Sequence, residues 1–245
     1  MNTKTVEDLV QKQRDFFLSG QTRPIDFRLD ALRKLRDALK VHEKDILAAV
    51  YADLRKAEVD AYATELAGVY NEIKVAIANV RDWAAREKVT TPIFMTPAKS
   101  YIYKEPYGVT LIIAPWNYPV QLVMLPLVGA IAAGNTAIVK PSELASHSAA
   151  IIDKVLGETF PEEYIRVVQG GVEETHALLA QQLDYIFFTG SVPVGKVVME
   201  AAARSRHQGT VRWLPVRPEE RRGVQQGKGR HHSGSGGHQG HGCHH

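Results

Sequence analysis

Two short polar clusters, each placed directly after an apolar run, carry the side chains in this chain that are best suited to chemistry. Trp116–Pro119 (WNYP) follows the run Val109–Ile113, and Lys140–Glu143 (KPSE) follows Ala137–Val139. An asparagine amide held on a proline-stiffened turn suits the stabilisation of a developing oxyanion. A lysine can donate to sugar hydroxyls, and a glutamate can accept from them. Both clusters therefore predict ligand contacts where a strand ends.

Each cluster, taken alone, has a simpler interpretation. Asn117 lies between two prolines, and asparagine is favoured in turns whatever its function. The second cluster could equally close a turn at the strand end, with Ser142 or Ser146 capping the helix that follows. Spacing alone leaves both turn chemistry and ligand binding open.

A third signal is the segment Phe188–Gly195 (FTGSVPVG), where a strand runs through Gly190 and Ser191 into a helix start. Unpaired N–H groups and the dipole of such a helix start favour a phosphate group. Pro193 needs no N–H partner in the first helical turn. The chain has no G-x-G-x-x-G dinucleotide fingerprint, and a plain strand-to-helix turn would look similar. Phosphate binding is therefore one of two interpretations of this segment.

These clusters sit in a regular alternation of strands and helices. Apolar, β-branched runs predict strands at Val109–Ile113, Ala137–Val139, Ile165–Val168 and Tyr185–Phe188. Each run is followed by a segment that predicts a helix, roughly 120–133, 142–157, 173–182 and 194–204. Strands that are apolar on both faces and alternate with helices indicate a parallel sheet covered on both sides. The predicted fold class is α/β, with amino-terminal helices and an incomplete doubly wound, Rossmann-like sheet.

Helices dominate the first ninety residues of this prediction. Leu32, Leu35 and Leu39 recur at helical spacing, and a second apolar stripe runs from Leu66 to Val80. The charged residues between these positions predict solvated outer faces. A connector over Thr90–Pro106 with a short extended segment near its end leads to the first strand of the sheet.

The character of the chain changes at Ser205. Residues 1–204 hold 23 Lys+Arg against 25 Asp+Glu, a net charge of −2, whereas residues 205–245 hold seven against two, a net charge of +5. The tail has five large apolar residues in 41 and no helix or strand period, which predicts disorder. We therefore expect a folded region over 1–204 and a disordered Arg-, His- and Gly-rich tail over 205–245. A frameshift or an assembly error would explain so abrupt a change.

Composition restricts the class of protein. A hydrophobic content of 44% and a charged content of 23% are typical of a soluble globular protein. No apolar run reaches the roughly 18–20 residues of a membrane span, and the polar amino terminus predicts a cytoplasmic protein. The single cysteine, Cys243, excludes an internal disulfide. The histidines and basic residues of the tail match no zinc module, so we expect neither a metal site nor a nucleic-acid partner.

Together the motifs resemble one family. The order and spacing of the aldehyde dehydrogenase superfamily recur in Pro115–Pro119, Gly129–Asn135, Lys140–Glu143, Gly170–Gly171 and Phe188–Ser191. The helical amino terminus resembles the class-three branch, whose members oxidise medium- and long-chain or aromatic aldehydes and form homodimers. The resemblance covers residues 1 to about 204, nearly the whole amino-terminal portion of such an enzyme.

The resemblance implies a role for each matching residue. Asn117 would donate its side-chain amide to the aldehyde oxygen, and Tyr118 would line the substrate passage. The residues that would bind the cofactor are Trp116, Lys140, Ser142, Glu143, Gly190, Ser191 and Gly195. Glu143 would accept a hydrogen bond from the adenosine ribose, and a carboxylate there disfavours a 2′-phosphate. NAD is therefore the expected cofactor, with NADP as the alternative.

The family reaction also requires a nucleophilic cysteine and a general-base glutamate. The motifs that supply them are missing, because the expected continuation gives way to the tail at Ser205. Cys243 stands in a different context, and Glu219 and Glu220 lie in polar sequence. The resemblance therefore implies NAD(P)-dependent oxidation of aldehydes, with this chain itself inactive. The alternative is a catalytically dead nucleotide-binding fragment.

Overall fold

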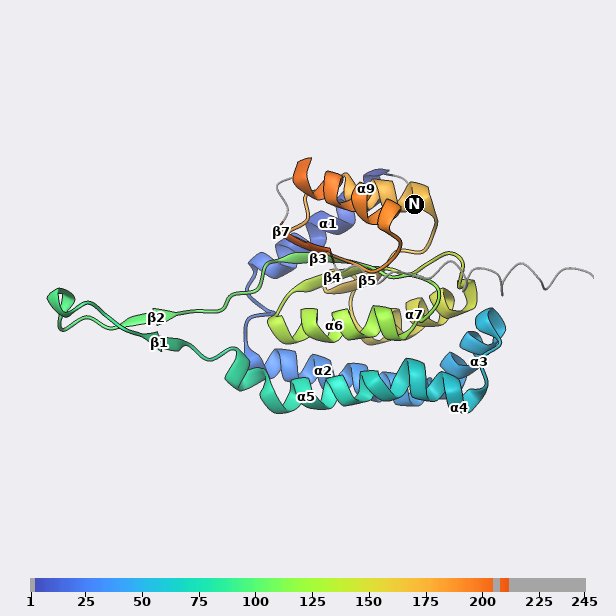
Figure 1. Cartoon of the computed structure of the whole chain (residues 1–245), viewed down its shortest axis with the longest axis horizontal. Helices are drawn as coiled ribbons and strands as arrows, with labels where there is room; N and C mark the ends of the chain where they lie inside the picture. Colours follow the sequence, from blue (N-terminus) through green and yellow to red (C-terminus); the bar gives the residue numbers. More distant parts are fainter. Residues whose placement is uncertain (1–2, 205–207, 212–245) are drawn as a thin grey trace, which may run out of the picture. The chain divides into compact units, whose positions relative to one another are not determined.

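A parallel sheet with the strand order β5-β4-β3-β6-β7 lies between two layers of helices (Figure 1). The structure, a computed structural model, describes residues 3–204 and 208–211. The strands are β3 Val109–Ile113, β4 Thr136–Lys140, β5 Ile165–Val167, β6 Tyr185–Phe188 and β7 Gln208–Val211. Every pairing between them is parallel. The predicted α/β class and the doubly wound sheet are confirmed.

The apolar runs form strands because both faces of the sheet are covered. All five residues of β3 and all five of β4 are buried. Successive side chains of a strand point to opposite faces, and Ile112 accordingly packs in one hydrophobic core while Leu111 and Ile113 pack in the other. A strand buried on both sides shows a continuous apolar run in place of an alternating one.

Helices cover each face of the sheet. On one face lie α6 Gln121–Ala133 and α7 Ser146–Thr159, backed by α2 Ile25–Val41, α3 Glu43–Leu54 and α5 Ala67–Trp83 (Figure 1). On the other face lie α1 Thr3–Leu18, α8 Val172–Leu179 and α9 Val192–Arg204. Among the residues that the structure describes, no helix is both long enough and apolar enough to cross a bilayer.

The amino-terminal helices follow their predicted apolar stripes. Leu32, Leu35 and Leu39 of α2 are fully buried. The helix α4, Glu58–Ala61, continues through a π-helical turn, Tyr62–Leu66, into α5. Arg28 and Glu65 lie just before the two predicted apolar stripes, and the prediction of solvated charges did not cover them. Both side chains are buried, because backbone groups and a lysine inside the protein satisfy them.

The connector before the sheet forms an arm that was only partly predicted. Its strands, β1 Glu87–Val89 and β2 Ser100–Ile102, pair antiparallel, and a short 3₁₀ turn, Ile93–Met95, lies between them. The sequence predicted the extended segment that becomes β2 and missed its partner β1. Figure 1 shows the arm reaching away from the helices that flank the sheet. Ile93 and Phe94 near its end are highly exposed.

The segment Gln208–Val211 lies within the part of the chain that the sequence analysis assigned to the tail. It forms β7, with Tyr185 of β6 opposite Gln208 and Phe188 opposite Val211. This short strand was not predicted from the sequence. Its backbone pairs with β6, although the sequence shows no strand period in this segment. The remainder of the predicted tail, with Cys243, lies outside the described residues.

Candidate functional site

The carboxyl ends of β3, β4 and β6 meet at one edge of the sheet. Ile113, the last residue of β3, pairs with Lys140 on one side and with Phe188 on the other. The ladder continues beyond the strand ends, because Ala114 N donates to Lys140 O at 3.2 Å and Thr189 N donates to Ile113 O at 3.0 Å. The polar clusters predicted from the sequence thus follow three neighbouring strands, roughly 5 Å apart in the sheet. Ligands of open α/β sheets bind at this edge.

Lys140 is the one charged residue of the predicted site that is buried. Its side chain is 2% exposed, and Nζ donates to Pro141 O at 3.0 Å and to Gly170 O at 2.6 Å. The Glu143 carboxylate lies 3.8 Å from Nζ and is half exposed. Burial lowers the pKa of Lys140, and the nearby carboxylates, Glu143 first, offset part of that effect. The ammonium can make a third hydrogen bond beside an open carboxylate, which suits a pair of neighbouring hydroxyls.

The loop between β4 and α7 does not use its serines as helix caps. Ser142 Oγ accepts from Leu144 N at 3.3 Å within the loop, and no side chain of the loop caps α7. Asp53 of α3 does so instead, since its carboxylate accepts from Ser148 N at 2.7 Å and from His147 N at 3.2 Å. The capping role considered for Ser142 or Ser146 is therefore wrong.

Replacing Asp53 with alanine should lower the free energy of unfolding by about 1 kcal/mol, because two N–H groups at the start of α7 lose their acceptor. Urea denaturation would measure the change. Asp30→Ala, which removes a carboxylate from an exposed pair with Lys34, serves as the control and should cost less than about 0.5 kcal/mol. Equal effects of the two changes would contradict the assigned cap.

Asn117 lies in the loop that follows β3 and is half-buried. Its side-chain oxygen Oδ1 is buried and has no hydrogen-bond partner among the described residues. Its backbone carbonyl accepts from Lys56 Nζ at 3.2 Å. Trp116 is half-buried, and Tyr118 is 37% exposed with Lys56 Nζ 4.0 Å from its ring centroid. The loop is thus held through its backbone, and the Asn117 side chain is not engaged in closing the turn.

The helix α9 begins directly after the third cluster. Gly195 N donates to Ser191 O at 3.0 Å, which closes the first helical turn. The N–H groups that precede it have no partner within the helix, as at any helix start. A Cβ added to Gly190 would lie 2.6 Å from the Phe188 ring, so this position favours glycine. A helix start whose first N–H groups have no partner within the helix favours a phosphate group.

Sequence reasoning missed two residues at this edge, Lys56 and Glu65. Glu65 is fully buried; its Oε1 lies 2.6 Å from Lys56 Nζ, and its Oε2 accepts from Val120 N and Gln121 N. One signal could have revealed it, because Glu65 is four residues before the buried Val69 and so shares the apolar stripe of α5.

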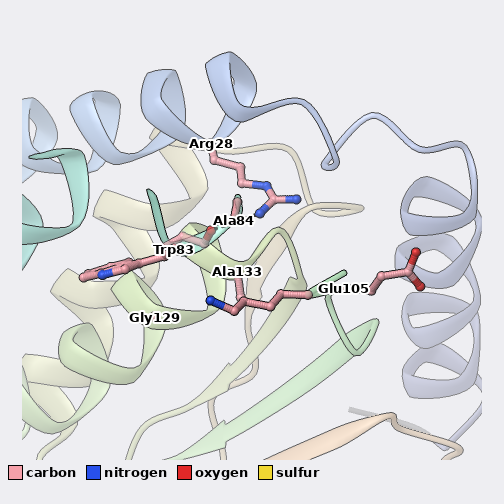
Figure 2. A pocket seen from close by; sticks show the side chains of 8 residues that line it. Arg28, Trp83, Ala84, Glu105, Gly129 and Ala133 are labelled. Carbon is pink, nitrogen blue, oxygen red and sulfur yellow. Dashed lines mark hydrogen bonds between the residues drawn. The ribbon is translucent and has the colours of Figure 1, made fainter. Parts of the chain in front are cut away.

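A surface pocket of about 310 Å³ lies at the other end of α6 (Figure 2). Figure 2 shows Arg28 and Trp83 approaching it from different helices. Its lining is Arg28, Trp83, Ala84, Lys104, Glu105, Gly129, Ala132 and Ala133. Since α6 runs from the carboxyl end of β3 to the amino end of β4, this pocket is at the opposite edge of the sheet from the predicted cofactor residues.

Known proteins similar to this chain are aldehyde dehydrogenases. Residues 1–211 match the aldehyde dehydrogenase family. The 4,4'-diaponeurosporen-aldehyde dehydrogenase of Staphylococcus aureus (strain NCTC 8325 / PS 47) is 50% identical over 200 residues, which are 82% of this chain and 44% of that protein. Aldehyde dehydrogenase family 3 member A2 of Macaca fascicularis is 47% identical over 81% of this chain and 41% of its own length. The chain spans less than half the length of these relatives.

Solved structures similar to this chain also include aldehyde dehydrogenases. The substrate-bound state of Staphylococcus aureus AldH superposes with a TM-score of 0.83 at 48% identity, over 85% of this chain and 45% of that one. A point mutant of betaine aldehyde dehydrogenase from Staphylococcus aureus, in complex with NAD+, gives a TM-score of 0.75 at 25% identity, over 84% of this chain and 41% of that one. The resemblance to the class-three branch is confirmed by the family 3 relatives. The chain belongs to the aldehyde dehydrogenase family.

Proposed function

We propose that this chain provides the cofactor-binding part of an NAD(P)-dependent enzyme that oxidises aldehydes to carboxylic acids. One observation carries the proposal: three polar residues lie at the carboxyl ends of neighbouring parallel strands, at one edge of the sheet. Lys140 is the last residue of β4, and Asn117 and Ser191 follow β3 and β6. Family membership supports the reaction class. The proposed substrate of that enzyme is an aldehyde with a medium- or long-chain or aromatic group.

The residues at this edge fit a dinucleotide. Lys140 and Glu143 present a donor and an acceptor to the adenosine ribose, and Ser142 lies between them in the same loop. Free N–H groups at the start of α9, after Ser191, suit the pyrophosphate. Gly190 and Gly195 complete this strand-to-helix turn with little bulk; Gly195 is buried.

NAD is the proposed cofactor, because the Glu143 carboxylate would repel a 2′-phosphate. NADP is the alternative. A dog relative, 42% identical over 81% of this chain and 44% of its own length, is a dimeric NADP-preferring aldehyde dehydrogenase. The bound cofactor would supply a hydride acceptor.

Asn117 is the proposed oxyanion donor. Its amide would donate to the aldehyde oxygen as negative charge develops there, and a donor already held in place stabilises that charge without reorganisation. Trp116 would line the cofactor side of the passage, and Tyr118, with its ring partly exposed, the substrate side.

We further propose that the 245-residue chain does not oxidise aldehydes by itself. Its single thiol, Cys243, and the glutamates Glu219 and Glu220 lie outside the described residues and match neither the nucleophile nor the base motif of the family. A shifted reading frame or an assembly error after about residue 204 remains our explanation of the tail. Resequencing codons 200–215 tests it, and an unchanged frame would overturn it. The cytoplasmic location and the homodimer stay predictions.

Calorimetric titration with NAD tests the proposed function. The chain should bind NAD in one saturable step, and NAD should raise its thermal stability, since a ligand that binds only the folded state stabilises it. Glu143→Gln should weaken binding up to roughly ten-fold through loss of a charge-assisted hydrogen bond. Glu7→Gln, at an exposed position of α1, is the control. Absence of binding at millimolar NAD by a folded chain would refute the proposal.

A further inference from the structure

Lys56 and Glu65 form a buried ion pair beside the proposed site. The Glu65 side chain is fully buried, the Lys56 side chain is 16% exposed, and Nζ lies 2.6 Å from Oε1. Removing two charges from water is costly, and their attraction offsets that cost only when the remaining hydrogen-bonding capacity is also satisfied. The partners of the pair therefore show which part of the structure the pair supports.

Those partners all belong to one five-residue segment. Glu65 Oε2 accepts from Val120 N at 3.1 Å and from Gln121 N at 3.0 Å, at the start of α6. Lys56 Nζ donates to Asn117 O at 3.2 Å and lies 4.0 Å from the centroid of the Tyr118 ring. A carboxylate at a helix start and an ammonium over an aromatic face are both favourable arrangements. The pair thus fixes the segment 117–121 at both ends.

The Asn117 side chain lacks comparable support of its own. Its Oδ1 is buried, and no hydrogen bond joins its amide to another residue in the described ranges 3–204 and 208–211. The direction of the amide is therefore set by the backbone that carries it, and that backbone is held by Lys56. The supporting residues come from outside the sheet, from the α3–α4 connection and the π-helical turn Tyr62–Leu66.

We propose that Lys56 and Glu65 are positioning residues, which fix the loop so that the Asn117 amide points at the aldehyde oxygen. That the amide points at an aldehyde rests on the proposed function. That Lys56 and Glu65 fix the orientation of the Asn117 amide does not. Neutralising either member leaves the other charge buried without its partner and releases one end of the loop. The Asn117 amide should then lose its single orientation.

Nuclear magnetic resonance of a chain labelled with ¹⁵N at asparagine tests this directly. The chain has five asparagines, at positions 2, 71, 79, 117 and 135, so its side-chain NH₂ signals are few. Asn117→Asp assigns the Asn117 pair. In Lys56→Met and in Glu65→Gln that pair should shift by more than its line width or broaden beyond detection. The Asn135 pair should stay in place, because Asn135 Oδ1 accepts from Gly108 N at 3.0 Å elsewhere in the fold.

Matched controls come from an exposed ion pair. Lys12 and Glu162 also form a lysine–glutamate pair, with side chains 57% and 45% exposed. Lys12→Met and Glu162→Gln should leave the Asn117 signals unchanged, and Lys56→Arg, which keeps the charge and a donor, should retain them. If the two NH₂ signals of Asn117 stay in place in a folded variant, the proposal is overturned. A uniform change of the NH₂ signals of all five asparagines in Glu65→Gln would also overturn it.

Two further outcomes are also decisive. Unfolding of Lys56→Met would move the NH₂ signals of all five asparagines together to the positions of an unfolded chain. In that case the nearly isosteric Glu65→Gln decides, again by whether the Asn117 signals shift or broaden. The experiment contains neither NAD nor aldehyde. If the chain fails to bind NAD but its Asn117 signals change in Lys56→Met and Glu65→Gln, the proposed function is refuted and the positioning role is retained.

Discussion

Replacement of Arg28 by methionine should lower the free energy of unfolding by about 3 kcal/mol. Arg28 of α2 is 6% exposed, and its guanidinium donates to three backbone carbonyls: Nε to Thr22 O at 3.1 Å, Nη2 to Arg23 O at 2.9 Å and Nη1 to Ala132 O at 3.3 Å. Each buried carbonyl left without a donor costs roughly 1–3 kcal/mol, and the loss of a buried charge offsets part of the total.

The Arg28 guanidinium also fills the space beside the end of α6. Gly134 there has φ +89°, and a Cβ at that position would lie 2.7 Å from the guanidinium. The side chain thus joins α2 to the turn that leads into β4. Urea denaturation would measure the loss. Arg81→Met, which breaks an exposed pair with Asp26, should cost less than about 1 kcal/mol. A similar small cost for Arg28→Met would show that its hydrogen bonds contribute little.

Replacement of Lys140 by methionine should weaken NAD binding by roughly ten- to one-hundred-fold, the equivalent of about 1.5–3 kcal/mol for a hydrogen bond to a charged group. Two effects combine. The ribose loses its ammonium donor, and the loop at Gly170 loses the hydrogen bond that ties it to β4. Calorimetric titration would give the dissociation constant.

Lys154→Met, at an exposed lysine of α7, is the matched control and should leave NAD affinity unchanged. Because burial lowers the pKa of Lys140, the wild-type chain should lose affinity on raising the pH sooner than it would with an exposed lysine. The sign follows from the chemistry, since only the protonated amine carries the charge that strengthens donation. A dissociation constant within two-fold of the wild-type value for Lys140→Met would contradict the assigned role.

Much of the sheet could be predicted from the sequence, because its central strands are buried on both sides. The predicted bounds of Val109–Ile113 and Tyr185–Phe188 coincide with β3 and β6. The strand β4 is longer than predicted by Thr136 and Lys140, whose side chains are polar and yet buried. Apolar periodicity detects the strand and underestimates its length where polar residues continue it.

The contacts that could not be predicted join residues far apart in the sequence. Glu65 accepts from an amide 55 residues away, and Asp53 caps a helix through an amide 95 residues away. A charge on a helix predicts a solvated face unless its partner is known. The strand β7 was missed for a related reason, because it is recognised by its pairing with the backbone of β6, which lies 20 or more residues away in the sequence.

In the candidate site, too, local motifs were predictable and contacts between distant residues were not. Asn117, Lys140 and Ser191 were chosen from local motifs, and the strand register then brings their strand ends to one edge. The motifs did not reveal that Lys140 would be almost fully buried, or that Lys56 would hold the Asn117 loop. The positions of the proposed site residues follow from strand order, whereas the residues that support them follow from tertiary packing.

Hydrogen–deuterium exchange with and without NAD tests the central claim most directly, because it locates bound cofactor along the backbone. Saturating NAD should slow exchange at the amides of Ser142–Ala145 and Gly190–Gly195, at the carboxyl edge of the sheet. Exchange at Gly129–Ala133, beside the pocket in Figure 2, should not change. Protection at that pocket, with none at the start of α9, would contradict the account.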